Sequence, residues 1–141
     1  MRLYFDASVL VALVVYEDRS QDARALIAHH EPPIVSSFAA LEMASAISRK
    51  VRMGELSTLQ ADDALTAFDV WLARDALQVI TSDRDVFAAA GLVRRYNLKL
   101  RTGDALHVTT AFRLGRTLRP LMQKWLRRLG PSASTLKTET R

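Results

Sequence analysis

The chain has 141 residues and a mass of 15.8 kDa, with 49% hydrophobic and 25% charged residues. This is the size and composition of one globular domain, which excludes wholesale disorder. It has no cysteine, which excludes disulfides, thiolate metal sites and thiol nucleophiles. No stretch is apolar enough to span a bilayer, and the apolar run of residues 9–16 follows Asp6 and makes a poor signal peptide. We therefore expect a cytoplasmic protein.

The net charge of +5 is unevenly distributed along the chain. Residues 1–112 carry 12 Lys or Arg and 14 Asp or Glu, whereas residues 113–141 carry 8 basic residues and only one acid, Glu139. The basicity therefore belongs to the last fifth of the chain. The larger part lacks the general basic character expected of a nucleic-acid-binding module.

Strand and helix patterns alternate along the first four-fifths of the chain. Short β-prone runs predict strands at residues 2–6, 32–36 and 77–80. Helical patterns predict helices over residues 9–15, 20–29, 38–52, 57–74, 83–95 and 104–114. Residues 17–20 suggest a turn and residues 98–102 a loop. This alternation predicts an α/β fold with a small parallel sheet flanked by helices.

Three helix starts carry capping signals. Ser8 can cap the first helix, Ser36 or Ser37 the long helix after the second strand, and Ser57 with Gln60 fits a capping box. The pattern ends after Gly115, because Pro120 disfavours a fourth strand at residues 117–118. Residues 121–129 have the apolar spacing of one helical face, and residues 131–141 have the composition of a flexible tail.

The residues with the clearest chemical potential are three carboxylates. Asp6 ends the first predicted strand, Asp104 begins the last helix, and Glu42 lies in an otherwise apolar helix. Ligand sites of parallel sheets form beyond the carboxyl ends of the strands. Converging carboxylates offer the oxygen ligands that Mg²⁺ or Mn²⁺ prefers, and such a cation activates water for phosphodiester hydrolysis.

Each acid also has a purely structural interpretation. Asp6 and Asp104 can serve as helix caps or dipole partners, and on a helical wheel Glu42 faces solvent, opposite Met43 and Ile47. Other polar and aromatic residues have ordinary interpretations as well. We expect packing for His107, Phe68 and Trp71, an exposed loop for His29 and His30, and first-turn helix charges for Asp62, Asp63, Asp83 and Asp85.

Three phrases together are far more specific than any single residue. They are residues 3–13 around Asp6, residues 35–49 around Glu42, and residues 100–115 around Asp104. In order and spacing this combination resembles the PIN-domain ribonucleases, specifically the VapC-type toxins of bacterial toxin–antitoxin pairs, over residues 2–118. The resemblance implies a three-layer PIN-like fold for residues 1–118 and a divergent segment for residues 119–141.

The resemblance also implies a site and partners. Asp6, Glu42 and Asp104 correspond to three members of the family's acidic cluster, which binds Mg²⁺ or Mn²⁺ for RNA cleavage. Ser8 corresponds to a hydroxyl residue that lines that site. The implied partners are an RNA substrate, a cognate VapB-like antitoxin and a second copy of the chain, with no membrane association.

The chain departs from the family pattern after residue 118. The family has a Thr-Phe-Asp-like triplet that supplies a fourth acid, whereas residues 119–126 here contain none. One codon choice for these residues, CGA CCT TTG ATG CAA AAA TGG CTN, encodes Thr-Phe-Asp-Ala-Lys-Met-Ala when read two bases later. We therefore hypothesise that a frame change replaced the family's C-terminus, which the nucleotide sequence would test directly.

Two functions follow from these patterns. The first is a metal-dependent endoribonuclease toxin, weakened by loss of the fourth acid. The second is a non-catalytic PIN-like protein that binds its antitoxin and regulates the operon. A basic-tailed RNA-binding module finds no support in residues 1–112, which carry a net charge of −2.

Overall fold

The computed structural model describes residues 2–15, 20–28 and 31–115. The chain divides into two compact units, Met1–Ile80 and Thr81–Arg141, which are described separately. The predictions made for residues 17–19, 29–30 and 116–141 lie outside the described residues. No helix among the described residues is long and apolar enough to cross a membrane.

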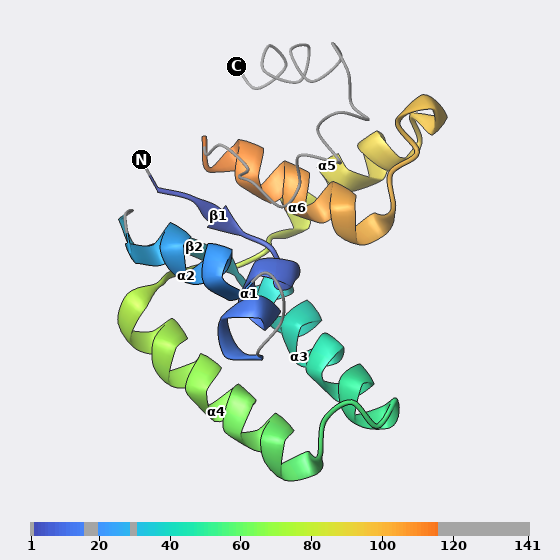
Figure 1. The fold of residues 1–141 in the computed structure, drawn as a ribbon. Coiled ribbons are helices and arrows are strands. Elements are labelled where there is room, and N and C mark those ends of the chain that lie inside the picture. The colour runs from blue at the N-terminus through green and yellow to red at the C-terminus, as the bar shows by residue number, and fades with distance from the viewer. Residues whose placement is uncertain (1, 16–19, 29–30, 116–141) are drawn as a thin grey trace. The chain divides into compact units, whose positions relative to one another are not determined.

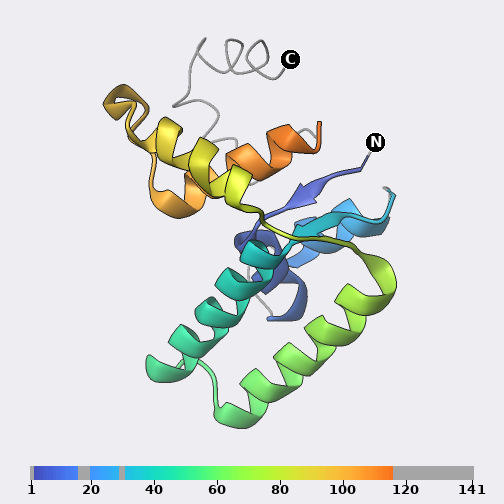
Figure 2. The ribbon, with the colours of Figure 1, turned by 180° about the vertical axis from the view of Figure 1, so that it is seen from behind.

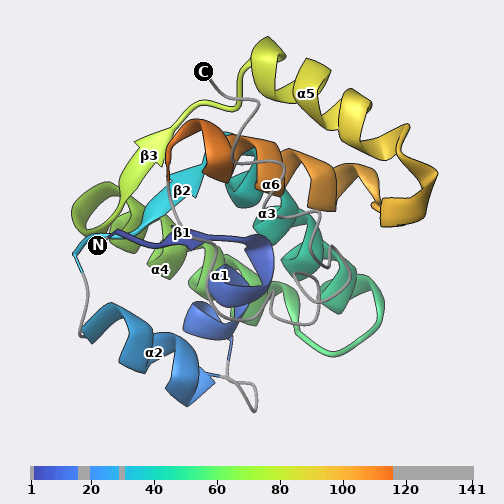
Figure 3. The same ribbon diagram turned by 90° about the horizontal axis from the view of Figure 1, so that it is seen from above.

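The first unit is built on a small parallel sheet, as the sequence predicts. Its strands are β1 (Tyr4–Phe5), β2 (Ile34–Ser36) and β3 (Leu77–Val79), in the order β1-β2-β3. Figure 3 shows the three strands side by side. Tyr4 pairs with Ile34, and Ile34 pairs with Leu77, so all three strands end at the same edge of the sheet.

Four helices accompany this sheet within the first unit (Figure 1). They are α1 (Ala7–Val14), α2 (Ser20–Ala28), α3 (Ser37–Arg52) and α4 (Thr58–Asp75). α1 packs against the other three helices, and α3 and α4 form a pair joined by residues 53–57, which Figure 2 shows from behind. The core between them is apolar and includes Leu10, Met43 and Ile47, each fully buried.

Local capping determines where these helices begin. Ser36 caps α3 by accepting a hydrogen bond from the Ala39 amide at 3.0 Å, and the predicted capping box of Ser57 and Gln60 begins α4. The prediction that Ser8 caps α1 is wrong. The carboxylate of Asp6 caps this helix instead, because it accepts the amides of Ser8 and Val9, and Ser8 lies inside the first turn.

The second unit contains a pair of packed helices. α5 (Asp83–Val93) is followed by a short 3-10 turn, η1 (Tyr96–Leu98), and by α6 (Thr102–Arg113). α6 therefore begins two residues before the predicted start at Asp104. His107 is buried in this helix, as expected for a packed residue.

An ion pair between the buried carboxylate of Asp85 and the partly exposed side chain of Arg113 joins the start of α5 to the end of α6. Arg113 donates to both carboxylate oxygens of Asp85, from Nε at 2.7 Å and from a terminal nitrogen at 2.9 Å. Asp85 also completes a capping box with Ser82, and Thr109 donates to its backbone carbonyl. Asp85 was expected to be only a first-turn charge; it lies in that turn, but it is 1% exposed and links the two helices.

The similar expectation for Asp62 and Asp63 is wrong, because the first turn of α4 contains no acid.

The environment of Asp85 makes the stability of the second unit depend on pH. Burial raises the pKa of this carboxyl, but hydrogen bonds from Arg113 and Ser82 outweigh burial and hold the pKa below its ordinary value. A carboxyl whose pKa is lower in the folded than in the unfolded chain stabilises the fold fully above about pH 4. This stabilisation is lost as the pH falls through the folded pKa.

We predict that Asp85→Asn lowers the free energy of unfolding at pH 7 by about 2 kcal/mol, because Arg113 loses a charged partner. The difference from the parent protein should shrink as the pH falls below 4. Urea denaturation followed by circular dichroism at both pH values measures it. Asp83→Asn, an exposed change in the same turn, is the control and should cost about 0.5 kcal/mol or less. Equal effects of the two substitutions would contradict this role for Asp85.

Candidate functional site

Asp6 lies where β1 ends and α1 begins, at the carboxyl edge of the sheet. Its Oδ1 accepts hydrogen bonds from the Ser8 amide at 3.0 Å, the Val9 amide at 3.2 Å and the Ser8 hydroxyl at 2.6 Å. Among the described residues, no hydrogen bond reaches Oδ2 of this half-buried carboxylate. Asp6 is therefore held in one orientation through one oxygen, while the other remains available to a ligand.

Ser8 contacts the acid that it was expected to accompany. It is exposed, and its hydroxyl donates to Asp6 over the short distance given above. Such a charge-assisted hydrogen bond restricts the orientation of the carboxylate. The structure thus places Ser8 beside Asp6, although its role in a reaction stays a prediction.

Ser36 lies at the same edge of the sheet as Asp6. It follows Val35, the parallel partner of Phe5, just as Asp6 follows Phe5. The buried Ser36 hydroxyl also forms a hydrogen bond of 2.7 Å with the Tyr4 hydroxyl while it caps α3. This contact ties β1 to the start of the helix that carries Glu42.

Glu42 occupies the second turn of α3, and its side chain is half-buried. The helical-wheel argument had placed it in solvent. It instead borders the buried stripe of Ala39, Met43 and Ile47, since it is three residues from Ala39 and adjacent to Met43. α3 packs against α1, the helix that Asp6 caps.

Asp104 is the third residue of α6, in the second unit. It is the acid of the first turn, where the unpaired amides of a helix favour negative charge. The residue before the helix, Arg101, makes no side-chain cap. Among the described residues, the half-buried Asp104 carboxylate has no hydrogen-bond or ion-pair partner, so both of its oxygens can accept a ligand.

The three predicted acids therefore lie in two units: Asp6 and Glu42 in the first, and Asp104 in the second. The described part of the chain contains no group of three or more His, Asp or Glu side chains placed to hold a metal ion. The convergence of the three acids on one cation stays a prediction. The donor set itself fits a hard divalent cation, because carboxylate oxygens are the ligands that Mg²⁺ and Mn²⁺ prefer.

The comparisons with known proteins identify the family. The family model described as PIN domain matches residues 3–118. The chain belongs to the PIN domain family. A search of curated proteins finds no significant match.

A solved structure supports the PIN fold. The toxin VapC20 of Mycobacterium tuberculosis, described as cleaving the sarcin–ricin loop, is similar with a TM-score of 0.66 and 16% sequence identity. The alignment covers 81% of this chain and 84% of VapC20. The predicted fold class, a small parallel sheet flanked by helices in a PIN-like arrangement, is confirmed.

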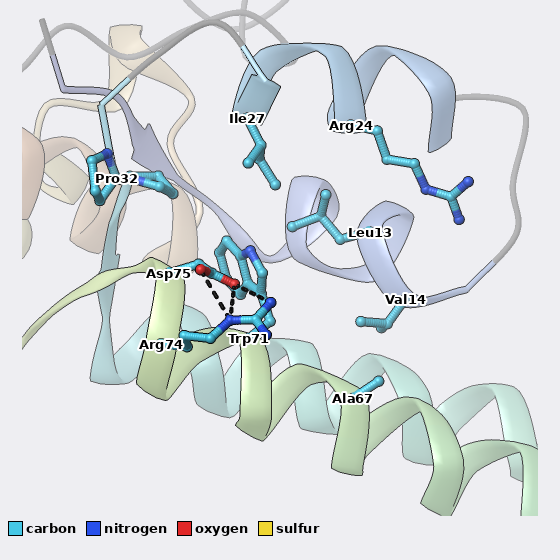
Figure 4. Close-up of a pocket in the computed structure, with 10 residues that line it drawn as sticks. Leu13, Val14, Arg24, Ile27, Pro32, Ala67, Trp71, Arg74 and Asp75 are labelled. Carbon is cyan, nitrogen blue, oxygen red and sulfur yellow. Dashed lines mark hydrogen bonds and ion pairs between the residues drawn. The ribbon is translucent and has the colours of Figure 1, made fainter.

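An apolar cavity of about 600 Å³ lies elsewhere in the first unit, between α1, α2 and α4. Figure 4 shows Leu13, Ile27 and Trp71 around this space. Arg74 and Asp75 lie at its edge, joined by a salt bridge of 2.9 Å. The sequence patterns placed Trp71 in the core with Phe68. Phe68 is buried, whereas Trp71 is only half-buried and lines this cavity.

The dual contacts of Asp6 allow its structural and chemical roles to be separated. We predict that Asp6→Ala lowers the free energy of unfolding by about 1 kcal/mol, because α1 loses its cap. Asp6→Asn should change it by only a few tenths, since asparagine caps equally well. Urea denaturation without divalent ions measures both effects. Equal destabilisation by both variants would show that charge, rather than capping, is what α1 requires.

Proposed function

We propose that this PIN-domain protein is a metal-dependent endoribonuclease and the toxin of a VapBC-like pair. The observation that carries the proposal is the placement of Asp6 at the carboxyl edge of the sheet, where hydrogen bonds from the described residues reach Oδ1 and none reaches Oδ2. Membership of the PIN family and similarity to an RNA-cleaving toxin support it. The reaction would take place in the cytoplasm, where its RNA substrate is found.

Asp6, Glu42 and Asp104 are the proposed ligands of Mg²⁺ or Mn²⁺. When bound, the cation would supply positive charge against the scissile phosphate and lower the pKa of a water molecule. Asp6 would bind through Oδ2, with Ser8 holding the carboxylate through Oδ1. Asp104 would bind from the first turn of α6, where the helix dipole favours negative charge.

The chain lacks the fourth carboxylate of the family's acidic cluster, which affects the activity that we propose. Residues 119–126 contain no acid that could act as the family's fourth carboxylate. Loss of a side chain that hydrogen-bonds to the metal ligands typically costs about 10- to 100-fold in metal affinity or activity. We therefore expect a weak nuclease, consisting of a PIN-like domain over residues 1–118 and a divergent segment over residues 119–141.

The proposed partners are the RNA substrate, a cognate antitoxin and a second copy of this chain. The exposed apolar side chains of Val86, Phe87 and Val93 on α5 support the homodimer, because a solvated helix face is usually polar. Sedimentation of the full chain as a monomer at all concentrations would refute the dimer.

We predict cleavage of single-stranded RNA that requires Mg²⁺ or Mn²⁺ and stops when EDTA is added. Asp6→Asn, Glu42→Gln and Asp104→Asn should each lower the cleavage rate by at least about 100-fold. This is the upper end of the range for side chains that only support the metal ligands, and a direct ligand should cost no less. Asp63→Asn on the exposed surface of α4 is the matched control and should leave the rate unchanged. Mn²⁺ should also raise the melting temperature of the parent protein but not of Asp6→Asn, because ligand binding stabilises the folded state.

The second candidate is a non-catalytic protein that binds its antitoxin and regulates the operon. It is favoured by the missing fourth acid and by the lack of a three-acid group within the described residues. Co-expression with the small neighbouring gene separates the two candidates. A nuclease toxin should arrest growth when it is expressed alone, and co-expression of that neighbour should relieve the arrest. The Asp104→Asn variant should not arrest growth, so it should need no such relief. Antitoxin binding without toxicity or cleavage would support the second candidate instead.

A further inference from the structure

A second cavity, of about 700 Å³, lies wholly within the described part of the second unit. It follows α5 and the last two turns of α6, with Thr109 and Phe112 on the α6 side. Along α5 its lining residues include Arg84, Ala88 and Gly91, which follow one another at helical spacing, and Arg95 lines it just beyond the helix. We call this feature the α5 groove. Nothing in the proposed metal chemistry uses it.

The charge of the α5 groove is concentrated at its two ends. Arg84 and Arg95 are both exposed, and within the described residues neither side chain has a hydrogen-bond or ion-pair partner. The other two charged lining residues, Asp85 and Arg113, form the ion pair described above. Two positive charges therefore remain uncompensated, about 16 Å apart along the helix axis. A ligand that matches them carries negative charge at intervals.

The residues that line the middle of the α5 groove are small or apolar. A Cβ atom at Gly91 would meet no atom within 4 Å, so the space above this residue is open. Ala88 lies one turn before it, and the half-exposed ring of Phe112 lines the same cavity from α6. An aromatic ring beside open space between two arginines suits a flat, apolar group flanked by anions.

We propose that the α5 groove binds single-stranded RNA, with phosphates at Arg84 and Arg95 and a base against Phe112. Basic side chains that follow the backbone, with aromatic rings on which bases stack, are the usual means of binding single strands. An acidic peptide would match the charges but would leave the ring and the space at Gly91 without a flat partner. The inference rests on the proposed ribonuclease function, to which it adds a contact distant in sequence from Asp6 and Glu42.

The test is binding of a fluorescein-labelled single-stranded RNA octamer to the full chain in EDTA, measured by fluorescence anisotropy at several salt concentrations. The double variant Arg84→Gln/Arg95→Gln should weaken binding at least tenfold in 0.1 M salt. It should also reduce the slope of log affinity against log salt by about 1.4, since each phosphate contact on a single strand contributes about 0.7. Gly91→Leu, which keeps every charge and favours the helix, should weaken binding at least threefold by filling the open space.

The matched control is Arg94→Gln. Arg94 is exposed and adjacent to Arg95, but it is not among the residues that line the cavity. It should leave the affinity within twofold and the salt slope unchanged, although it removes one positive charge, as each half of the double variant does. Circular dichroism of every variant confirms that the helices are retained.

Three results would overturn the proposal. They are unchanged RNA binding in both groove variants, an equal loss in Arg94→Gln, or tighter groove-dependent binding of an oligoglutamate peptide than of the RNA. Because the assay contains no divalent ion, it is independent of cleavage. Metal-dependent cleavage with unaffected binding would refute the groove alone, whereas groove-dependent binding without any cleavage would refute only the nuclease.

Discussion

The parallel pairing of β1 with β2 is the constraint on which the candidate site depends. Since both strands run the same way, their carboxyl ends meet at one edge, and Asp6 and Ser36 follow paired residues there. Each of these side chains then begins a helix, and the Tyr4–Ser36 hydrogen bond joins β1 to the start of α3. The carboxylate proposed as a metal ligand is thus supported by the same contacts that begin the fold's central helices.

Asp6 shows how one residue can serve structure and chemistry together. The three hydrogen bonds that its side chain accepts from described residues all reach Oδ1, so capping α1 does not occupy the whole carboxylate. A cap and a metal ligand are usually considered competing interpretations of an acid at a helix start, but here the two oxygens divide the roles. The same division explains why asparagine should preserve stability while removing the proposed chemistry.

The second unit depends on a different interaction, the ion pair between the buried carboxylate of Asp85 and the partly exposed side chain of Arg113. It joins the start of α5 to the end of α6, and α6 carries Asp104. By using both charges internally, this pair leaves Arg84 and Arg95 as the net charge of the α5 groove. The stability of this unit and its proposed affinity for RNA therefore both depend on which arginine pairs with Asp85. Arg113 forms that pair, whereas Arg84 and Arg95 carry the charge proposed to bind phosphates.

Hydrophobic periodicity and capping are local properties, so the sequence by itself determined the three strands, most helix limits and the cap at Ser57, and it narrowed the cap of α3 to Ser36 or Ser37. The resemblance of three phrases to the PIN family, which the family model confirms, was also evident in the sequence. Only the tertiary structure decided that Asp6 rather than Ser8 caps α1, that Glu42 is half-buried, and that Asp85 pairs with Arg113. Arg113 follows Asp85 by 28 residues, so no spacing rule could have joined them. Burial of a side chain and the partner of a charge depend on which surfaces pack together, and that information is not contained in any single segment.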